Sequence, residues 1–156
     1  MAKSNSSKVC ALICHLNVRL GLAICGILLG AFWSVIYIAV FKNWIALSAS
    51  LLSVLFAFLT LYIYILQKCN IFESKLSPKT RYILMVFNAI FMIFSVVAFF
   101  MSIIFAIVLK QGVSVKDQFA FSDHSQNLWS TCTWFLILFK WTLQNTLILR
   151  FSLKSA

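Results

Sequence analysis

Four long stretches almost free of charge constrain what this chain can fold into. Residues 20–41, 43–67 and 82–109 contain no Asp, Glu, Lys or Arg, and in 128–149 Lys140 alone breaks the pattern. Each stretch provides the about 20 residues that a helix needs to cross a ~30 Å hydrocarbon core. Lipid does not tolerate unpaired backbone groups, and the two-residue alternation of barrel strands is missing. The stretches therefore predict membrane-spanning helices.

Composition agrees with a membrane protein. The chain is 63% hydrophobic and 10% charged, whereas soluble domains are typically about 45–50% apolar and ~25% charged. We therefore expect an all-α membrane protein in which 1–156 form a single transmembrane domain. Its four helices are expected at about 20–41, 45–67, 82–109 and 128–149.

The positive charges predict how the chain is oriented in the bilayer. The net charge is +10, yet the basic residues lie at the ends of the apolar stretches and not along one folded face, which argues against nucleic acid as a partner. Cytoplasmic segments are enriched in Lys and Arg. Both termini are therefore predicted to be cytoplasmic. The two termini and the 68–81 loop carry nine basic residues, and the other side carries three: Lys42, Lys110 and Lys116.

Small residues at four-residue spacing predict close helix packing. The first stretch contains Gly26 and Gly30, and the second contains Ala49, Ser53 and Ala57. Such ridges let helices approach closely, either within one chain or between subunits. We expect the contact within one chain, and a subunit contact is the alternative.

Lys140 is the most unusual residue of the fourth stretch. It lies more than ~13 Å from either end of a helix over 128–149. A lysine at the middle of a membrane helix costs roughly 2.5–3.5 kcal/mol on insertion scales and usually faces a bundle interior or a wet cavity. We therefore expect Lys140 to face an interior.

Two interpretations of Lys140 stay open. Lys140 and Gln144 share one helix face, and Trp134 and Trp141 stand on an adjoining one. A cation beside aromatic planes suits a flat anionic amphiphile, because the charge meets carboxylates and the indoles meet the ring system. The alternative is structural, with Lys140 hydrogen-bonded to helix carbonyls or to polar side chains such as Asn88.

Other side chains offer chemistry along a route across the membrane. His124 lies in the polar 110–127 loop on the outer side, and His15 and Arg150 lie toward the cytoplasmic side. Tyr62 and Tyr64 fall in the inner third of the second stretch, where at most one faces the bundle because residues two apart point about 200° apart. Phenolate and imidazole both bind heme iron, whereas an interfacial tyrosine belt is the alternative.

Catalysis is not expected from this sequence. The acidic residues Glu73, Asp117 and Asp123 all lie in loops, and we see no acid/base pair in the membrane, no phosphate loop and no zinc-spaced cluster. We therefore expect transport or scaffolding, without a catalytic cofactor.

Four pieces of the sequence occur in a distinctive order and spacing. They are Leu12-Ile13-Cys14-His15-Leu16-Asn17-Val18-Arg19-Leu20-Gly21, Leu61-Tyr62-Ile63-Tyr64, Asn127-Leu128-Trp129 and Lys140-Trp141-Thr142-Leu143-Gln144-Asn145. With them the sequence resembles the heme-responsive-gene family of four-helix heme transporters, in its nematode-type branch. The resemblance extends over essentially all four stretches, and the order and spacing of its pieces make it fairly specific.

This resemblance implies transport of heme into the cytoplasm, from outside the cell or from an endosomal or lysosomal lumen. The implied location is the plasma membrane or an endosomal or lysosomal membrane. In the family, a histidine in the second outer loop is proposed to receive heme, and a histidine or tyrosine on helix two passes it on. The helix-two position corresponds to Tyr64.

Two family positions differ here. Lys110-Gln111-Gly112 stands where the family has His-Gln-Gly, so an iron ligand is replaced by a cation that can pair with a propionate, and His124 is the candidate substitute. The family's aromatic-Ala-Arg-Lys-Tyr tail motif corresponds to Ile148-Leu149-Arg150-Phe151-Ser152, which keeps the arginine.

The combined interpretation is a heme transporter. Heme is expected to bind at the outer loop through His124 or Lys110, to contact Lys140 and Tyr64, or Tyr62, inside the bundle, and to leave near Arg150 and His15. Tyr64 and His124 are the expected iron ligands. A homo-oligomer in the lipid bilayer is expected, because one four-helix bundle has little room for so large a planar ligand. The alternative is a non-transporting four-helix adaptor or accessory subunit.

Overall fold

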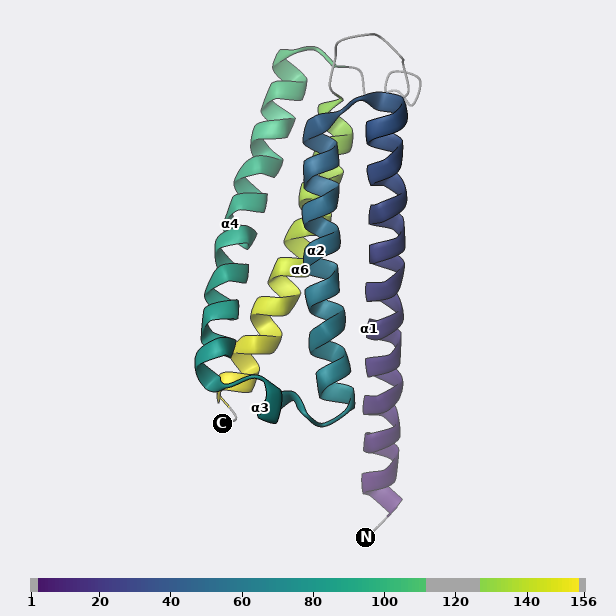
Figure 1. Ribbon diagram of the computed structural model, residues 1–156, viewed down its shortest axis with the longest axis vertical. Coiled ribbons are helices and arrows are strands. Elements are labelled where there is room, and N and C mark those ends of the chain that lie inside the picture. Colours follow the sequence, from purple (N-terminus) through teal and green to yellow (C-terminus); the bar gives the residue numbers. More distant parts are fainter. Residues whose placement is uncertain (1–2, 112–126, 155–156) are drawn as a thin grey trace.

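The computed structural model describes residues 3–111 and 127–154, with the side chains of 16–111 and 127–153. This part of the chain consists of helices and their connections, with no strand (Figure 1). Three helices in it are long and apolar enough to cross a membrane, namely Leu16–Phe41, Trp44–Lys68 and Pro78–Val108. The expected all-α membrane fold is confirmed at that level.

The first helical segment is longer than the apolar stretch. Helix α1 (Lys3–Ile36) continues into a π-helical turn η1 (Tyr37–Phe41). It starts well before the expected residue 20, and residues 3–20 contain no Gly or Pro that would stop a helix. The turn ends at Lys42, which adopts a left-handed conformation with φ 48° and donates its N–H to the carbonyl of Tyr37.

Helices α2 (Trp44–Lys68), α4 (Pro78–Val108) and α6 (Leu128–Lys154) begin at side-chain caps. The carboxamide oxygen of Asn43 accepts from Ala46 N at 3.0 Å, and the hydroxyl of Ser77 accepts from Thr80 N at 3.2 Å. Asn127 accepts from Trp129 N at 2.9 Å. These caps bind backbone N–H groups that helix starts otherwise leave unpaired.

A short helix, α3 (Phe72–Lys75), lies in the connection between α2 and α4, where the sequence predicted only a polar loop. Phe72 and Leu76 are buried at this end of the bundle. Arg81 is buried as well, with its guanidinium over the Phe72 ring at 5.2 Å and its Nε donating to the carbonyl of Leu76 at 2.8 Å. The connection is therefore packed as part of the fold.

Helices α2 and α6 form the central pair of the bundle. Helix α1 packs on α2, and α4 packs on α6 (Figure 1). The start of α1 and the end of α6 lie at the same end of the molecule as α3. Thr60 donates to the carboxamide oxygen of Asn145 at 2.8 Å, and Asn145 donates back to the carbonyl of Phe56, which fixes the register of α2 against α6.

The small-residue ridges pack within the chain, as expected. A Cβ added at Gly26 would lie 2.4 Å from Trp141, and one at Gly30 would lie 2.4 Å from Val54. Ala49 and Ala57 are fully buried. The small residues therefore let α1 approach α2 closely and leave room for the Trp141 ring against α1.

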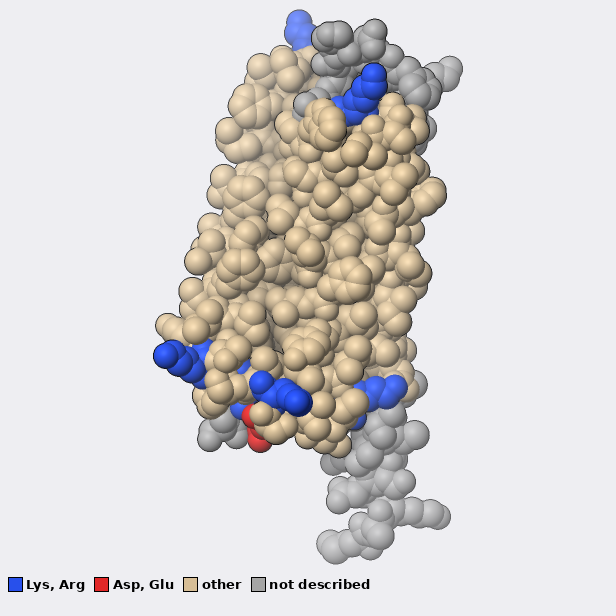
Figure 2. Space-filling model, viewed as in Figure 1, with Lys and Arg blue, Asp and Glu red and all other residues tan. Residues whose placement is uncertain are grey.

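Apart from Lys140, the described charged side chains gather at the two ends of the bundle. Figure 2 shows an uncharged middle on the visible face, with Lys and Arg at both ends and the acidic side chain at the α3 end. Among the described side chains Glu73, in α3, is the single acidic one. An uncharged band between two charged ends is the surface pattern of a protein that crosses a bilayer.

Candidate functional site

The two tyrosines of α2 have opposite environments, as predicted from their spacing. Tyr64 is 1% exposed and Tyr62 is 48% exposed. Tyr64 therefore faces the bundle, and Tyr62 lies on its outer surface. This leaves one of the pair in a position to bind a ligand inside the protein.

Gln144 of α6 connects Tyr64 to the outer side of the bundle. Its Nε2 donates to the Tyr64 hydroxyl. Gln144 is half-buried and also lines a groove on the surface of α6. The sequence showed that Gln144 shares a face with Lys140 but not that it contacts Tyr64. The signal available was a carboxamide deep in an apolar stretch, which needs a hydrogen-bond partner.

Lys140 does not face the bundle interior, and that expectation was wrong. Its side chain is exposed, with Nζ over the ring of the neighbouring Trp141 at 3.9 Å. The buried face of α6 includes Leu138, Trp141 and Asn145, and Lys140 lies outside it. The free-energy cost of placing a lysine in lipid indicates that the lysine needs a partner. It does not say on which side of the helix that partner lies.

The groove beside Lys140 has a volume of about 570 Å³. Its walls are apolar except for Lys140 and Gln144. All of its lining residues belong to α6: Leu136, Ile137, Phe139, Lys140, Leu143, Gln144 and Leu147. The groove therefore combines an apolar wall, one cation and one carboxamide that reaches a buried phenol.

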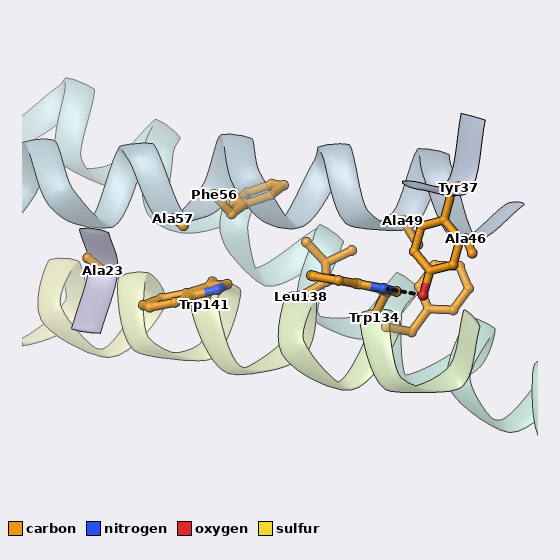
Figure 3. Close-up of a cluster of buried hydrophobic side chains, with 10 residues drawn as sticks. Ala23, Tyr37, Ala46, Ala49, Phe56, Ala57, Trp134, Leu138 and Trp141 are labelled. Carbon is orange, nitrogen blue, oxygen red and sulfur yellow. Dashed lines mark hydrogen bonds between the residues drawn. The ribbon is translucent and has the colours of Figure 1, made fainter. Parts of the chain in front are cut away.

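Trp134 and Trp141 of α6 are core residues, so the expectation that their indoles meet a ligand ring was wrong. Trp134 is 6% exposed and donates from Nε1 to the hydroxyl of Tyr37 at 2.9 Å, and Trp141 is 2% exposed against Gly26 (Figure 3). In Figure 3 both rings lie among buried side chains of the neighbouring helices. The aliphatic side chains and Phe139 form the groove wall instead.

Two buried polar atoms lack a hydrogen-bond partner within the described part of the chain. They are the carboxamide oxygen of Asn88 and the indole Nε1 of Trp141. Asn88 donates its Nδ2 to the carbonyl of Leu84 at 2.7 Å, so the predicted alternative, in which Asn88 binds Lys140, is not observed. The Lys140 ammonium lies over Trp141 instead.

Tyr37 is a second buried phenol that the sequence argument missed. It is 6% exposed, lies in the π-helical turn and packs against Trp33, Phe41 and Trp134. Its position at the end of an apolar stretch resembles an ordinary interfacial tyrosine. A π-helical turn is not readable from the sequence pattern, so no signal marked Tyr37 as buried.

The predicted outer capture residues are only partly described. Lys110 follows α4 in a left-handed conformation with φ 52° and is exposed. Gln111 accepts from Leu128 N at 2.9 Å through its side chain, which ties the end of α4 to the start of α6. His124 lies outside the described residues.

The predicted release residues lie toward the opposite end. Arg150 is exposed near the end of α6. His15 belongs to α1, and its side chain lies outside the described part. The structure brings together Tyr64, Gln144 and the Lys140 groove, and it leaves Tyr62 on the outer surface.

The fold and this site define an all-helical membrane protein with a polar contact beneath a largely apolar surface groove. A family model described as "Haem-transporter, endosomal/lysosomal, haem-responsive gene" matches residues 82–141. The heme transporter hrg-6 of Caenorhabditis elegans is 43% identical over 141 residues, which cover 90% of this chain and 84% of that protein. The chain belongs to the haem-responsive-gene family.

Two further relatives from Caenorhabditis elegans support the same family assignment. The heme transporter hrg-4 is 34% identical over 153 residues, covering 90% of this chain and 82% of hrg-4. The heme transporter hrg-5 is 30% identical over 149 residues, covering 96% of this chain and 88% of hrg-5. No solved structure matches the chain significantly.

Proposed function

We propose that this protein transports heme across a membrane into the cytoplasm. The observation that carries the proposal is the buried Tyr64 hydroxyl, which Gln144 connects to a groove containing Lys140. A phenolate is an established heme-iron ligand, and a cation suits the propionates. Membership of a family whose relatives are named heme transporters supports the same ligand.

The proposed orientation of the chain rests on the distribution of charge, and the direction of transport into the cytoplasm is the one that the family resemblance implies. Nine basic residues belong to the termini and the 68–81 loop, against three on the other side. The positive-inside rule makes the richer side cytoplasmic. Heme then enters at the outer loop near His124 and Lys110, passes Tyr64, and leaves near Arg150 and His15. The membrane is the plasma membrane or an endosomal or lysosomal membrane, where heme from outside or from a lumen is available.

A fourth span through α6 is part of this proposal. Helix α6 has 27 residues, which extend over ~40 Å at ~1.5 Å per residue and exceed a ~30 Å hydrocarbon core. It is less apolar than α2 and α4, because Lys140, Gln144 and Asn145 lie among its apolar residues. Its extensive packing along α4 supports an equal depth in the bilayer.

Glycosylation in microsomes tests this topology. The chain carries its own acceptor, Asn5-Ser6-Ser7, which we expect to stay unmodified because a cytoplasmic N-terminus does not meet the luminal enzyme. An Asn-Ser-Thr acceptor with flexible spacers inserted within 112–126 is expected to be modified. Glycans at Asn5, or at an acceptor added after Ala156, would contradict the topology.

The proposed oligomeric state follows from the dense packing of side chains inside the bundle. Buried side chains from three helices, including Phe56, Leu138 and Trp141, fill the space between them (Figure 3). A large planar ligand therefore needs a path along the surface of the bundle, and copies of the chain that share this surface enclose such a path. We propose a homo-oligomer on this basis.

Heme-dependent growth tests the transport function. A heme-auxotrophic cell that expresses this protein is expected to grow at hemin concentrations that do not support the parent cell. The control is an equal membrane level of an unrelated four-helix protein. Equal growth of the two strains over the full range of hemin concentrations would contradict heme transport.

A second candidate function is favoured by the exposure of Lys140. A non-transporting adaptor or accessory subunit would pair this lysine with an intramembrane acid of another protein. Such a protein would give no growth rescue. It would co-purify with a second membrane protein, and Lys140→Ala would abolish that association.

A further inference from the structure

The exposed face of α6 carries a charge that the described side chains leave without an anion. Lys140 lies over Trp141 and is exposed, and the single described acidic side chain, Glu73, lies at the end of the bundle in α3. From the proposed heme transport we infer that the groove over 136–147 is a heme site, in which a propionate pairs with Lys140 and the macrocycle lies on the apolar wall.

The depth of Lys140 restricts which anions can reach it. Lys140 lies ~18 Å along α6 from Leu128 and ~15 Å from Arg150. Phospholipid head groups lie at the bilayer surface, outside the ~30 Å hydrocarbon core. An anion at Lys140 must therefore be attached to an apolar body that enters the hydrocarbon core, and a porphyrin with propionates has this chemistry.

A second copy of the chain does not neutralise Lys140. The four apolar stretches contain no Asp or Glu, so the membrane-spanning surface of a copy offers its own Lys140 and otherwise only apolar or neutral polar groups. A lysine deep in the membrane usually pairs with an opposite charge or with backbone carbonyls. Charge complementarity thus favours an anionic ligand over another copy.

The lining of the groove fits a flat apolar ligand with few polar groups. Its volume of about 570 Å³ falls within the about 300–1,000 Å³ of typical ligand pockets. Five of its seven lining residues are apolar, and the polar ones, Lys140 and Gln144, stand one helical turn apart. Strongly polar ligands find few hydrogen-bond partners on such a wall.

Gln144 is the positioning residue between this groove and the buried phenol. It lines the groove, and its Nε2 donates to the Tyr64 hydroxyl. Heme held at Lys140 therefore lies beside the groove side chain that is hydrogen-bonded to Tyr64.

Hemin and hemin dimethyl ester, which lacks both carboxylates, provide the test. Purified protein in nanodiscs is titrated with each compound and followed by Soret absorbance. Wild type is expected to bind hemin about tenfold more tightly than the ester, since a charge-assisted pair contributes roughly this much. Lys140→Met is expected to remove this preference, and Lys140→Arg to keep it.

Matched control variants distinguish binding in the groove from the general effects of losing a charge or adding a bulky side chain. Lys75→Met removes an exposed cation of α3 and is expected to keep the preference. Leu136→Trp fills the groove and is expected to weaken both compounds, whereas Leu55→Trp, at a position 63% exposed on α2, leaves both unchanged. Equal affinity of wild type for both compounds, or an undiminished preference in Lys140→Met, would overturn the inference.

Different results would contradict the heme site in the groove and the transport function. Growth rescue by a protein that binds hemin without a Lys140-dependent preference leaves transport standing and removes the groove site. A Lys140-dependent preference without growth rescue leaves a heme-binding groove on a protein that does not transport heme.

Discussion

Replacing Tyr64 by Phe is expected to raise the hemin concentration needed for half-maximal growth by about tenfold or more. The phenol oxygen is the buried group that we assign to the heme iron, and loss even of a group that supports a metal ligand costs about 10–100-fold. Phe keeps the ring in its buried place on α2. The measurement is growth of a heme-auxotrophic cell over a range of hemin concentrations.

Tyr62→Phe is the matched control, because Tyr62 lies two residues away on the same helix and is 48% exposed. It loses the same hydroxyl and is expected to behave as wild type. Membrane levels of both variants must be equal, since Tyr64→Phe also removes the acceptor for Gln144. Indistinguishable growth of the two variants would remove Tyr64 from the transport route.

Gly26→Ala is expected to lower the free energy of unfolding by about 1–3 kcal/mol, the usual cost of overpacking a filled core. Its Cβ would lie 2.4 Å from Cζ2 of Trp141, a ring that is 2% exposed and therefore has little room to move. Since Lys140 lies over the same ring, movement of Trp141 also disturbs the groove. Thermal unfolding in detergent, followed by tryptophan fluorescence, measures the change.

Gly21→Ala is the control on the same helix. Beyond its own turn of α1, the described residues place no heavy atom within 4 Å of an added Cβ at Gly21, so the midpoint of this variant is expected to equal that of wild type or to exceed it slightly, because alanine favours helix. Equal unfolding midpoints for the two variants would show that the packing of Trp141 against Gly26 does not contribute to stability.

The long helices, and the fact that at most one of Tyr62 and Tyr64 faces the bundle, could be predicted from local rules. Charge-free length indicates a membrane helix wherever it occurs, and a step of 100° per residue separates Tyr64 from Tyr62 regardless of tertiary structure, whereas the choice of Tyr64 came from the family resemblance. The packing role of Gly26 followed in the same way, from residue size at four-residue spacing. These predictions depend on one helix at a time.

The side of α6 on which Lys140 lies could not be predicted in this way. Bulky residues surround α6 on all sides, so the sequence does not mark which face contacts α2 and α4. The hydrogen bonds of Asn145 with α2 decide the rotation of α6, and they place Trp141 inside and Lys140 outside. The π-helical turn and α3 were missed for a related reason, since both depend on contacts between segments.

The Gln144 contact shows where sequence and structure complement each other. The sequence identified Tyr64 and Lys140 as separate candidates on different helices. The structure connects them through Gln144, whose role depends on the relative position of α2 and α6. The candidate site is thus defined by a helix–helix contact and not by a motif.

Hemin uptake by liposomes that contain the purified protein tests heme transport most directly. Liposomes loaded with an apo-hemoprotein report each entering heme by a rise in Soret absorbance. We predict a faster rise with wild-type protein than in protein-free liposomes, and a rate near the protein-free value with Tyr64→Phe. A wild-type rate equal to that of protein-free liposomes would contradict the account.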